Sequence, residues 1–138
     1  MQYLDRTTLG QLASEAADSP RRRRNRNLHA GPEDGVQRML NAFEPGTYVR
    51  PHRHGDPPKW ELFVALQGRA AVLEFDAGGT VCERVELAPG GAVSGVEIPA
   101  GTWHTLVALE AGTVLLEVKP GPFEPLSDKD FAPWAPAE

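Results

Sequence analysis

The feature that most constrains the fold is a series of short apolar runs separated by glycine- and proline-rich turns. The chain has 14 glycines and 13 prolines, and turn sequences such as EPG, GDPP, DAGG and APGG separate the runs. Runs of this length between turn residues are typical of strands in an all-β sandwich or barrel. The expected strands are VQRMLNAF, TYVRPHRH, ELFVALQ, RAAVLEF, VCERVEL, VSGVEIP, WHTLVALE and TVLLEVK. The pattern therefore predicts an all-β fold.

A short helix is expected near the start of the chain, over residues 8–18. Its apolar side chains recur at helical spacing on one stripe. The stripe consists of Leu9, Leu12, Ala13 and Ala16. Thr7 or Thr8 is the expected N-cap, and Ser19, followed by proline, is expected to end the helix.

The two ends of the chain differ from its middle. Residues 21–27, RRRRNRN, follow the helix. They suggest a solvated arm, with a subunit contact or an anion-binding arm as alternatives, because a short basic run in an acidic protein is a poor nucleic-acid patch. We therefore divide the chain into a helix and Arg-rich arm over 1–28 and a barrel over 29–138. The barrel's tail, GPFEPLSDKDFAPWAPAE, carries aromatic side chains that we expect to pack along the barrel or on a second subunit.

Composition narrows the functional class. A chain of 138 residues fits one domain. The net charge of −5 argues against general nucleic-acid affinity. No apolar run is long enough for a membrane span, and the first residues lack the pattern of a signal peptide. The single cysteine, Cys82, forms no intrachain disulfide. We therefore expect a cytoplasmic protein.

The histidines indicate a metal site. Of the four in the chain, His52 and His54 are one residue apart, so on a strand both rings would point to the same face. Such a pair alone is also compatible with a solvated edge strand. A third, His104, follows the turn sequence PAG at the start of another expected strand. Together the three favour a metal site, whereas the fourth, His29, is less favoured as a ligand.

These two stretches resemble the two sequence motifs of the cupin superfamily. The first motif is matched by Gly46, His52, His54, Glu61 and Gly68, and the second by Pro99, Gly101 and His104. The resemblance implies a single-domain cupin, which is a double-stranded β-helix or jelly-roll barrel. It also implies that His52, His54, Glu61 and His104 bind one divalent metal ion.

A more extensive resemblance covers most of residues 25–138. The matching stretches include NRNLH, VQRMLNA, PGTYVRPHRH, KWELFV, VEIPAGTWHTLVALE, GTVLLEVKPGP and KDFAPWAPAE. They are similar to the WbuC-type cupin metalloproteins, a family associated with bacterial surface-polysaccharide (O-antigen) gene clusters. The resemblance implies a role in that metabolism and leaves the reaction open.

The fourth ligand and the identity of the metal stay open at this point. Six residues, GDPPKW, separate His54 from Glu61, where the common cupin motif leaves three or four. Glu61 is therefore either a ligand or a carboxylate outside the ligand set. Three imidazoles and one carboxylate would suit Zn, Fe, Mn, Ni or Cu. Cys82 lies far along the chain and is not an expected ligand.

Residues beside the expected ligands are candidates for binding and catalysis. Strand alternation would place Tyr48 and Arg50 on the face of the histidines. Arg50 would hold a carboxylate or phosphate of a ligand, or else an ion pair with a barrel carboxylate such as Glu61. Trp60 would stack on a sugar face or pack at the rim. Tyr48, Lys59 and Glu61 are the candidate acid–base groups.

Three functions compete on these observations. The first is a small metalloenzyme acting on an anionic or sugar-derived molecule, and the second is a metal-dependent binding or sensor module without catalysis. The third is a structural barrel with a vestigial site. We expect the chain to form a homodimer and to bind a small anionic or sugar-derived molecule rather than nucleic acid or a membrane.

Overall fold

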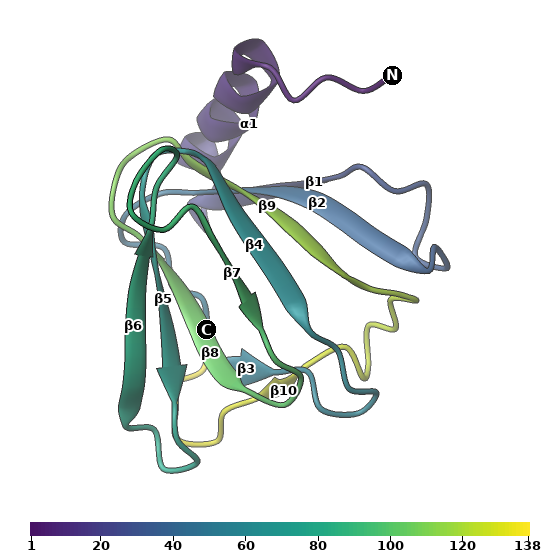
Figure 1. Cartoon of the computed structure of the whole chain (residues 1–138), viewed down its shortest axis with the longest axis vertical. Helices are drawn as coiled ribbons and strands as arrows, with labels where there is room; N and C mark the ends of the chain where they lie inside the picture. Colours follow the sequence, from purple (N-terminus) through teal and green to yellow (C-terminus); the bar gives the residue numbers. More distant parts are fainter.

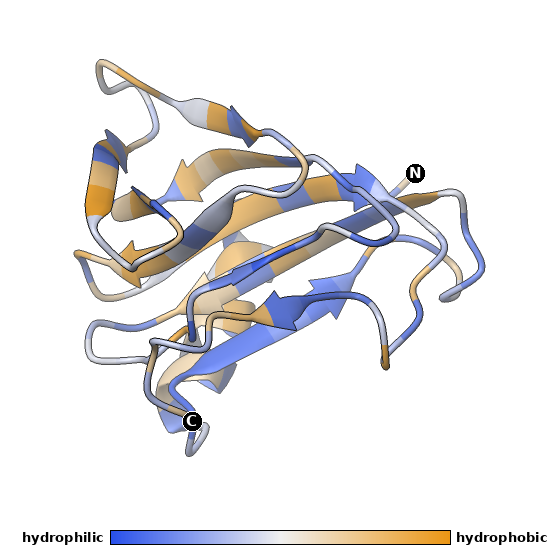
Figure 2. Cartoon of the chain, turned by 90° about the horizontal axis from the view of Figure 1, so that it is seen from below, coloured by the Kyte–Doolittle hydropathy of each residue, from blue (hydrophilic) through white to orange (hydrophobic).

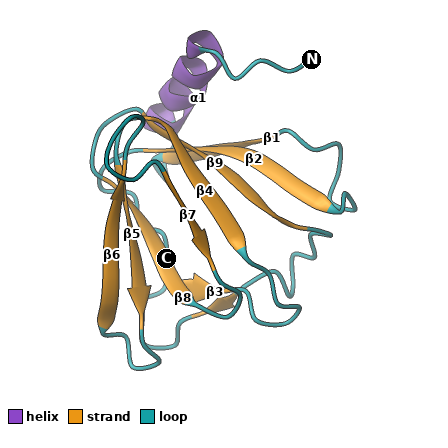
Figure 3. Cartoon of the chain, viewed as in Figure 1, coloured by secondary structure: helices purple, strands orange, loops and turns teal.

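The strands form two five-stranded antiparallel sheets. The computed structural model describes residues 1–138, and its strand order is β1-β2-β9-β4-β7 in one sheet and β10-β3-β8-β5-β6 in the other (Figures 1 and 3). The first sheet contains β1 (Arg23–Asn27), β2 (Val36–Phe43), β9 (Thr113–Pro120), β4 (Glu61–Gln67) and β7 (Gly95–Ile98). The second contains β10 (Asp130–Phe131), β3 (His52–Arg53), β8 (Trp103–Ala108), β5 (Ala70–Phe75) and β6 (Val81–Leu87).

The barrel core lies between the two sheets. Strand alternation turns apolar side chains of both sheets inward, and Figure 2 shows the strands as apolar stretches interrupted by hydrophilic positions. The core cluster contains Phe43, Phe63, Ala65, Ala70, Val72, Leu87, Ile98, Leu106, Ala108 and Leu115. The predicted all-β jelly-roll barrel with a short N-terminal helix is therefore confirmed.

Helix α1 (Arg6–Asp18) covers the outer face of the first sheet (Figure 1). Its predicted apolar stripe is buried and forms a second cluster with side chains of β2 and β9. This cluster contains Leu9, Leu12, Ala13, Ala16, Leu40, Ala42 and Val114. The helix starts earlier than predicted, because the Asp5 carboxylate, rather than Thr7 or Thr8, caps it by accepting a hydrogen bond from the Thr8 N–H at 2.9 Å. It ends at Ser19, as predicted.

Part of the Arg-rich segment is an edge strand rather than a free arm. Strand β1 (Arg23–Asn27) pairs with β2 along its whole length. Alternation and register put Arg23 on the inner face, opposite Phe43, and Arg24 on the outer face. There Arg24 Nε lies 3.8 Å from the Glu15 carboxylate of α1. The interpretation as a solvated arm is therefore wrong for β1, because backbone pairing fixes it although its side chains are polar.

The tail packs along the outer face of the second sheet, one of the two locations expected from the sequence. Strand β10 pairs with β3. The Trp134 ring lies 5.0 Å from the Phe75 ring and 6.4 Å from the Trp103 ring, measured between centroids. Aromatic contact of this kind fixes the tail beside the strand that carries His52.

The stretch TYVRPHRH is less regular than predicted. Only His52 and Arg53 form a strand, β3, and residues 46–51 have no regular structure. The alternation expected through Pro51 therefore does not hold, which matters for the neighbouring side chains.

Gly68 has a physical reason to be glycine. Its φ is +73°, in the left-handed region that other residues rarely adopt. A Cβ there would lie 2.5 Å from Thr113 Oγ1 and 2.8 Å from Thr113 Cα. This turn between β4 and β5 therefore requires glycine on both grounds.

No helix of the structure has the length and apolar character needed to cross a membrane.

Candidate metal centre

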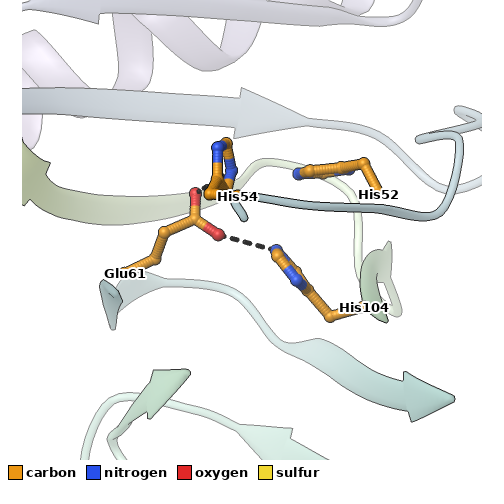
Figure 4. Close-up of side chains that lie close together, drawn as sticks. All are labelled: His52, His54, Glu61 and His104. Carbon is orange, nitrogen blue, oxygen red and sulfur yellow. Dashed lines mark ion pairs between the residues drawn. The ribbon is translucent and has the colours of Figure 1, made fainter. Parts of the chain in front are cut away.

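The four predicted ligands meet at one end of the barrel. His52 in β3 and His104 in β8 are directly opposite each other in the antiparallel ladder, and His54 follows β3. Glu61 reaches them from the facing sheet, as the first residue of β4. All four side chains are buried, and their ligand atoms lie within 4.8 Å of one another (Figure 4).

The long GDPPKW turn does not keep Glu61 away. Gly55 and Pro58 form a bridge within the turn, and the Lys59 N–H donates to the His54 carbonyl at 3.2 Å. The extra residues therefore fold back on themselves, and the chain returns to the cluster at Glu61.

Hydrogen bonds to backbone carbonyls fix the tautomer of each imidazole. Nδ1 of His52 lies 2.9 Å from the Arg50 carbonyl, and Nδ1 of His104 lies 2.9 Å from the Thr102 carbonyl. Nδ1 of His54 faces the Asp128 carbonyl. A carbonyl oxygen only accepts, so each Nδ1 carries the proton. Each Nε2 is therefore left to face the centre of the cluster, as in a metal-binding histidine.

The atoms at the centre lack hydrogen-bond partners. Glu61 Oε2 lies 2.7 Å from His104 Nε2, and Glu61 Oε1 lies 3.1 Å from His54 Nε2 (Figure 4). Despite these distances, His54 Nε2, His104 Nε2 and Glu61 Oε2 are buried without a hydrogen bond of regular geometry. Buried polar atoms without partners are costly. A shared cation would satisfy all three, so the residues fit one divalent transition metal ion.

The pKa values also favour a cation at this point. Burial and the neighbouring His104 lower the pKa of His52 to about 3, so its ring is neutral. Burial alone would raise the pKa of Glu61, but His104 and His54 outweigh it and hold that pKa well below its usual range. Burial alone would lower the pKa of His104, but Glu61 outweighs it and raises the pKa. A metal ion competes with the proton that this carboxylate attracts.

A cavity of about 1330 Å³ opens from the cluster and runs along the inner faces of β1 and β2. His52, His54 and Glu61 form part of its wall, and it extends to Arg23 and Glu138. A cavity of this size accepts a ligand larger than a single small anion.

One wall of the cavity is charged. Asn41 Nδ2 donates to Glu117 Oε1 at 2.8 Å, and Lys119 Nζ lies 3.6 Å from Glu117 Oε2. Lys119 also donates to Asp128 Oδ2 at 3.2 Å, and Lys59 Nζ lies 3.6 Å from Asp128 Oδ1. Burial raises the pKa of Glu117, and the charge of Glu61 adds to this effect. The site therefore holds a buried carboxyl group outside the ligand set.

Arg50 lies in the cavity wall without an acidic partner. No carboxylate is within 4.0 Å of its guanidinium group, so the alternative of an ion pair with Glu61 is excluded. Its Nη2 donates to the Ala132 carbonyl at 3.2 Å, and its guanidinium carbon lies 5.0 Å from the centre of the Phe131 ring. Its Nε is buried without a hydrogen bond. Arg50 is thus a cation next to the cluster whose Nε–H can still donate a hydrogen bond to a ligand.

Three other predicted site residues lie outside the ligand set. Tyr48 is 40% exposed, and its hydroxyl donates to the Pro136 carbonyl at 2.7 Å. It lines only a smaller pocket, because the irregular chain before Pro51 breaks the expected alternation. Lys59 is buried, and its Nζ donates to the Pro122 carbonyl at 2.7 Å. Trp60 is 40% exposed and lines neither hollow.

His29 and Cys82, which the sequence did not favour as metal ligands, lie outside the cluster. His29 is in the cavity wall outside the cluster, and its Nδ1 accepts a hydrogen bond from the Arg38 N–H at 2.9 Å. Cys82 is exposed and free.

Sequence reasoning missed Glu117, Lys119 and Asp128. A signal for the first two was present, because strand alternation in TVLLEVKP puts both on the face of the core residue Leu115. Charged residues at inward positions indicate a polar cavity. No comparable signal existed for Asp128, which lies in the irregular tail.

Solved structures define the class of this fold. KdgF from Halomonas sp. matches with 20% identity and a TM-score of 0.58, over 78% of this chain and 85% of that one. Oxalate decarboxylase from Bacillus subtilis matches with 22% identity and a TM-score of 0.60, over 79% of this chain and 27% of that one. The capsular polysaccharide assembling protein CapF from Staphylococcus aureus matches with 23% identity and a TM-score of 0.60, over 78% of this chain and 28% of that one. The chain thus has the fold of a single-domain cupin, and its cluster of His52, His54, Glu61 and His104 fits a metal site.

Its family follows from the sequence. The chain belongs to the family described as "Domain of unknown function (DUF6016)", whose profile matches residues 4–87. The comparison with curated proteins gives no match. The chain spans less than a third of the length of the oxalate decarboxylase and CapF chains.

The charged wall predicts that Asp128 is essential for stability. We expect Asp128→Asn to lower the free energy of unfolding by about 3 kcal/mol, because two buried ammonium groups lose their shared carboxylate. Urea unfolding measures this loss. The matched control is Asp130→Asn, which removes an exposed ion pair with Arg53 and is expected to cost less than about 1 kcal/mol. Equal losses in the two variants would contradict the interpretation.

Proposed function

We propose that His52, His54, Glu61 and His104 hold one divalent transition metal ion that binds a small anionic or sugar-derived molecule. The observation that carries this proposal is the convergence of three buried imidazoles and one buried carboxylate. Of their atoms, His54 Nε2, His104 Nε2 and Glu61 Oε2 have no hydrogen-bond partner. In such a site a divalent metal supplies Lewis-acid polarisation of a ligand oxygen.

The chain's own residues would orient the ligand. Arg50 would hold its carboxylate or phosphate, because a guanidinium fork suits two oxygens at once. Glu117 would exchange protons with the ligand, since its buried carboxyl has a raised pKa. Among the acid–base candidates from the sequence, Glu61 belongs to the ligand set, and the proposal does not use Tyr48 or Lys59.

The proposed biological role is in bacterial surface-polysaccharide (O-antigen) metabolism, as a WbuC-type cupin in the cytoplasm. The sequence resemblance over residues 25–138 supports it, and the likeness to a capsular polysaccharide assembling protein is in keeping with it. Catalysis is the first candidate, and ligand sensing through the same metal is the alternative.

Metal content tests the ligand set. Protein purified without added metal is expected to carry a stoichiometric amount of one divalent metal, measured by elemental analysis. His52→Ala and His104→Ala are expected to lose it with an unchanged circular dichroism spectrum, because each removes one ligand. The matched control is His29→Ala, which removes a cavity histidine outside the cluster and is expected to keep the metal. Metal retained in all three variants would contradict the proposed ligand set.

Arg50 tests the ligand class. Sugar acids and nucleotide sugars are screened against the metal-loaded protein by calorimetry, and NMR of the same mixtures detects turnover. We expect Arg50→Gln to weaken an anionic ligand roughly 10- to 100-fold, the value of a charged hydrogen bond. Arg53→Gln is the control, because Arg53 stacks on Trp103 and pairs with the exposed Asp130.

An equal effect of the two arginine variants would argue against Arg50 as the ligand's partner. Turnover of a bound compound identifies an enzyme. Saturable binding without turnover identifies the sensor.

We also propose a homodimer. Leu126 and Phe131 in the tail expose apolar surface, at 100% and 48% of their full areas, and such surface favours association. Sedimentation velocity is expected to give the mass of two chains, and Leu126→Asp with Phe131→Asp the mass of one. A single-chain mass for the unaltered protein at micromolar concentration would refute this.

A further inference from the structure

Two arginines share one carboxylate at the far end of the cavity from the metal cluster. Arg21 Nη2 lies 2.9 Å from Glu138 Oε2, and Arg23 Nη2 lies 2.8 Å from Glu138 Oε1. Each guanidinium thus binds a different oxygen of the same group. No other carboxylate lies within 4.0 Å of either arginine. The arrangement is that of a two-oxygen anion held between two cationic forks.

The backbone of the turn that presents these arginines has a defined conformation. Arg22, between them, has φ of 56°, in the left-handed region that is costly for a residue with a Cβ. Hydrogen bonds hold the turn in place: the Arg22 carbonyl accepts from the Glu44 N–H at 2.9 Å, and the Arg21 carbonyl accepts from Thr47 Oγ1 at 2.6 Å. The Arg23 guanidinium also donates to the Tyr48 carbonyl. The backbone positions of the two arginines are therefore fixed, and the Arg23 guanidinium is held on both sides.

The pair is accessible from two hollows. The 1330 Å³ cavity that holds the metal cluster is lined by Arg21, Arg23 and Glu138, and so is a second pocket of about 290 Å³. The Glu138 carboxylate therefore occupies the place where the two hollows meet. Its removal would leave two guanidinium groups facing open space.

The contact with Glu138 is exchangeable. The side chains of Arg21 and Glu138 are 65% and 39% exposed, and exposed ion pairs contribute little to stability. Partial burial would raise the pKa of Glu138, but Arg23 and Arg21 outweigh it and lower the pKa, so the group is an anion at neutral pH. A free anion of similar shape can displace it once its concentration offsets the effective concentration of the tethered carboxylate.

We propose that Arg21 and Arg23 form an anion-binding subsite at the mouth of the cavity and that Glu138 occupies this subsite until a ligand displaces it. The anion is a phosphate or carboxylate group at the end of the ligand remote from the metal. This assignment rests on the proposed function only in that the ligand shares the metal's cavity.

Titration with small anions tests the subsite. Inorganic phosphate and acetate are titrated into the purified protein by calorimetry at constant ionic strength. Glu138→Gln is expected to bind one of them about tenfold more tightly than the unaltered protein, because the competing carboxylate is gone. A preference for phosphate assigns a phosphoryl group, and a preference for acetate assigns a carboxylate.

The chain offers a closely matched control. Glu86 also bridges two arginines, Arg69 at 3.0 Å and Arg84 at 2.9 Å, but lines neither hollow. Glu86→Gln is expected to leave anion affinity unchanged. An equal gain in both variants would show a general charge effect and overturn the proposal, as would no gain in Glu138→Gln.

A second substitution identifies the arginines. Adding Arg23→Gln to Glu138→Gln is expected to abolish the gain, whereas adding Arg84→Gln is expected to preserve it. A gain that survives Arg23→Gln would overturn the assignment. Circular dichroism verifies the fold of every variant. Metal content is measured on the same samples, so that loss of the metal site and loss of the anion subsite are seen separately.

Discussion

The functional end of this barrel depends on three hydrogen bonds from imidazole Nδ1 atoms to backbone carbonyls. The acceptors belong to Arg50, Thr102 and Asp128. Because they are backbone atoms, the fold itself sets each ring's tautomer and direction. The Glu61 carboxylate then arrives from the opposite sheet. The candidate metal centre thus joins both sheets.

The wall of the cavity next to this centre carries both positive and negative side chains, some paired with each other and one without an acidic partner. The buried Glu117, Lys119 and Asp128 pair with one another, whereas Arg50 has no acidic partner. The paired groups maintain the shape of the wall, since breaking such pairs is expensive. The unpaired cation is free to select a ligand. One cavity can therefore be rigid and selective at once.

The sequence predicted the fold class and the four residues that the structure brings together in the candidate metal centre. His52, His54 and His104 were predictable from the spacing of the first two, from the turn sequence before His104 and from the cupin resemblance. Glu61 was indicated by the resemblance alone. Tyr48 could not be placed, because residues 46–51 form no strand and strand alternation does not apply to them. Strand β1 was missed for another reason: its residues are all polar, and only pairing with β2 and contacts with α1 make it part of the sheet. Such tertiary pairing overrides local pattern.

The hydrogen bond from His54 to the Asp128 carbonyl ties the tail to the metal centre. The tail is in turn fastened by the packing of Trp134 on Phe75 and by the pairing of β10 with β3. We therefore expect metal coordination and docking of the tail to be coupled, and by linkage the coupling free energy is the same in both directions. Residues 128–134 therefore support the orientation of a predicted metal ligand from behind, although none of their side chains belongs to the predicted ligand set.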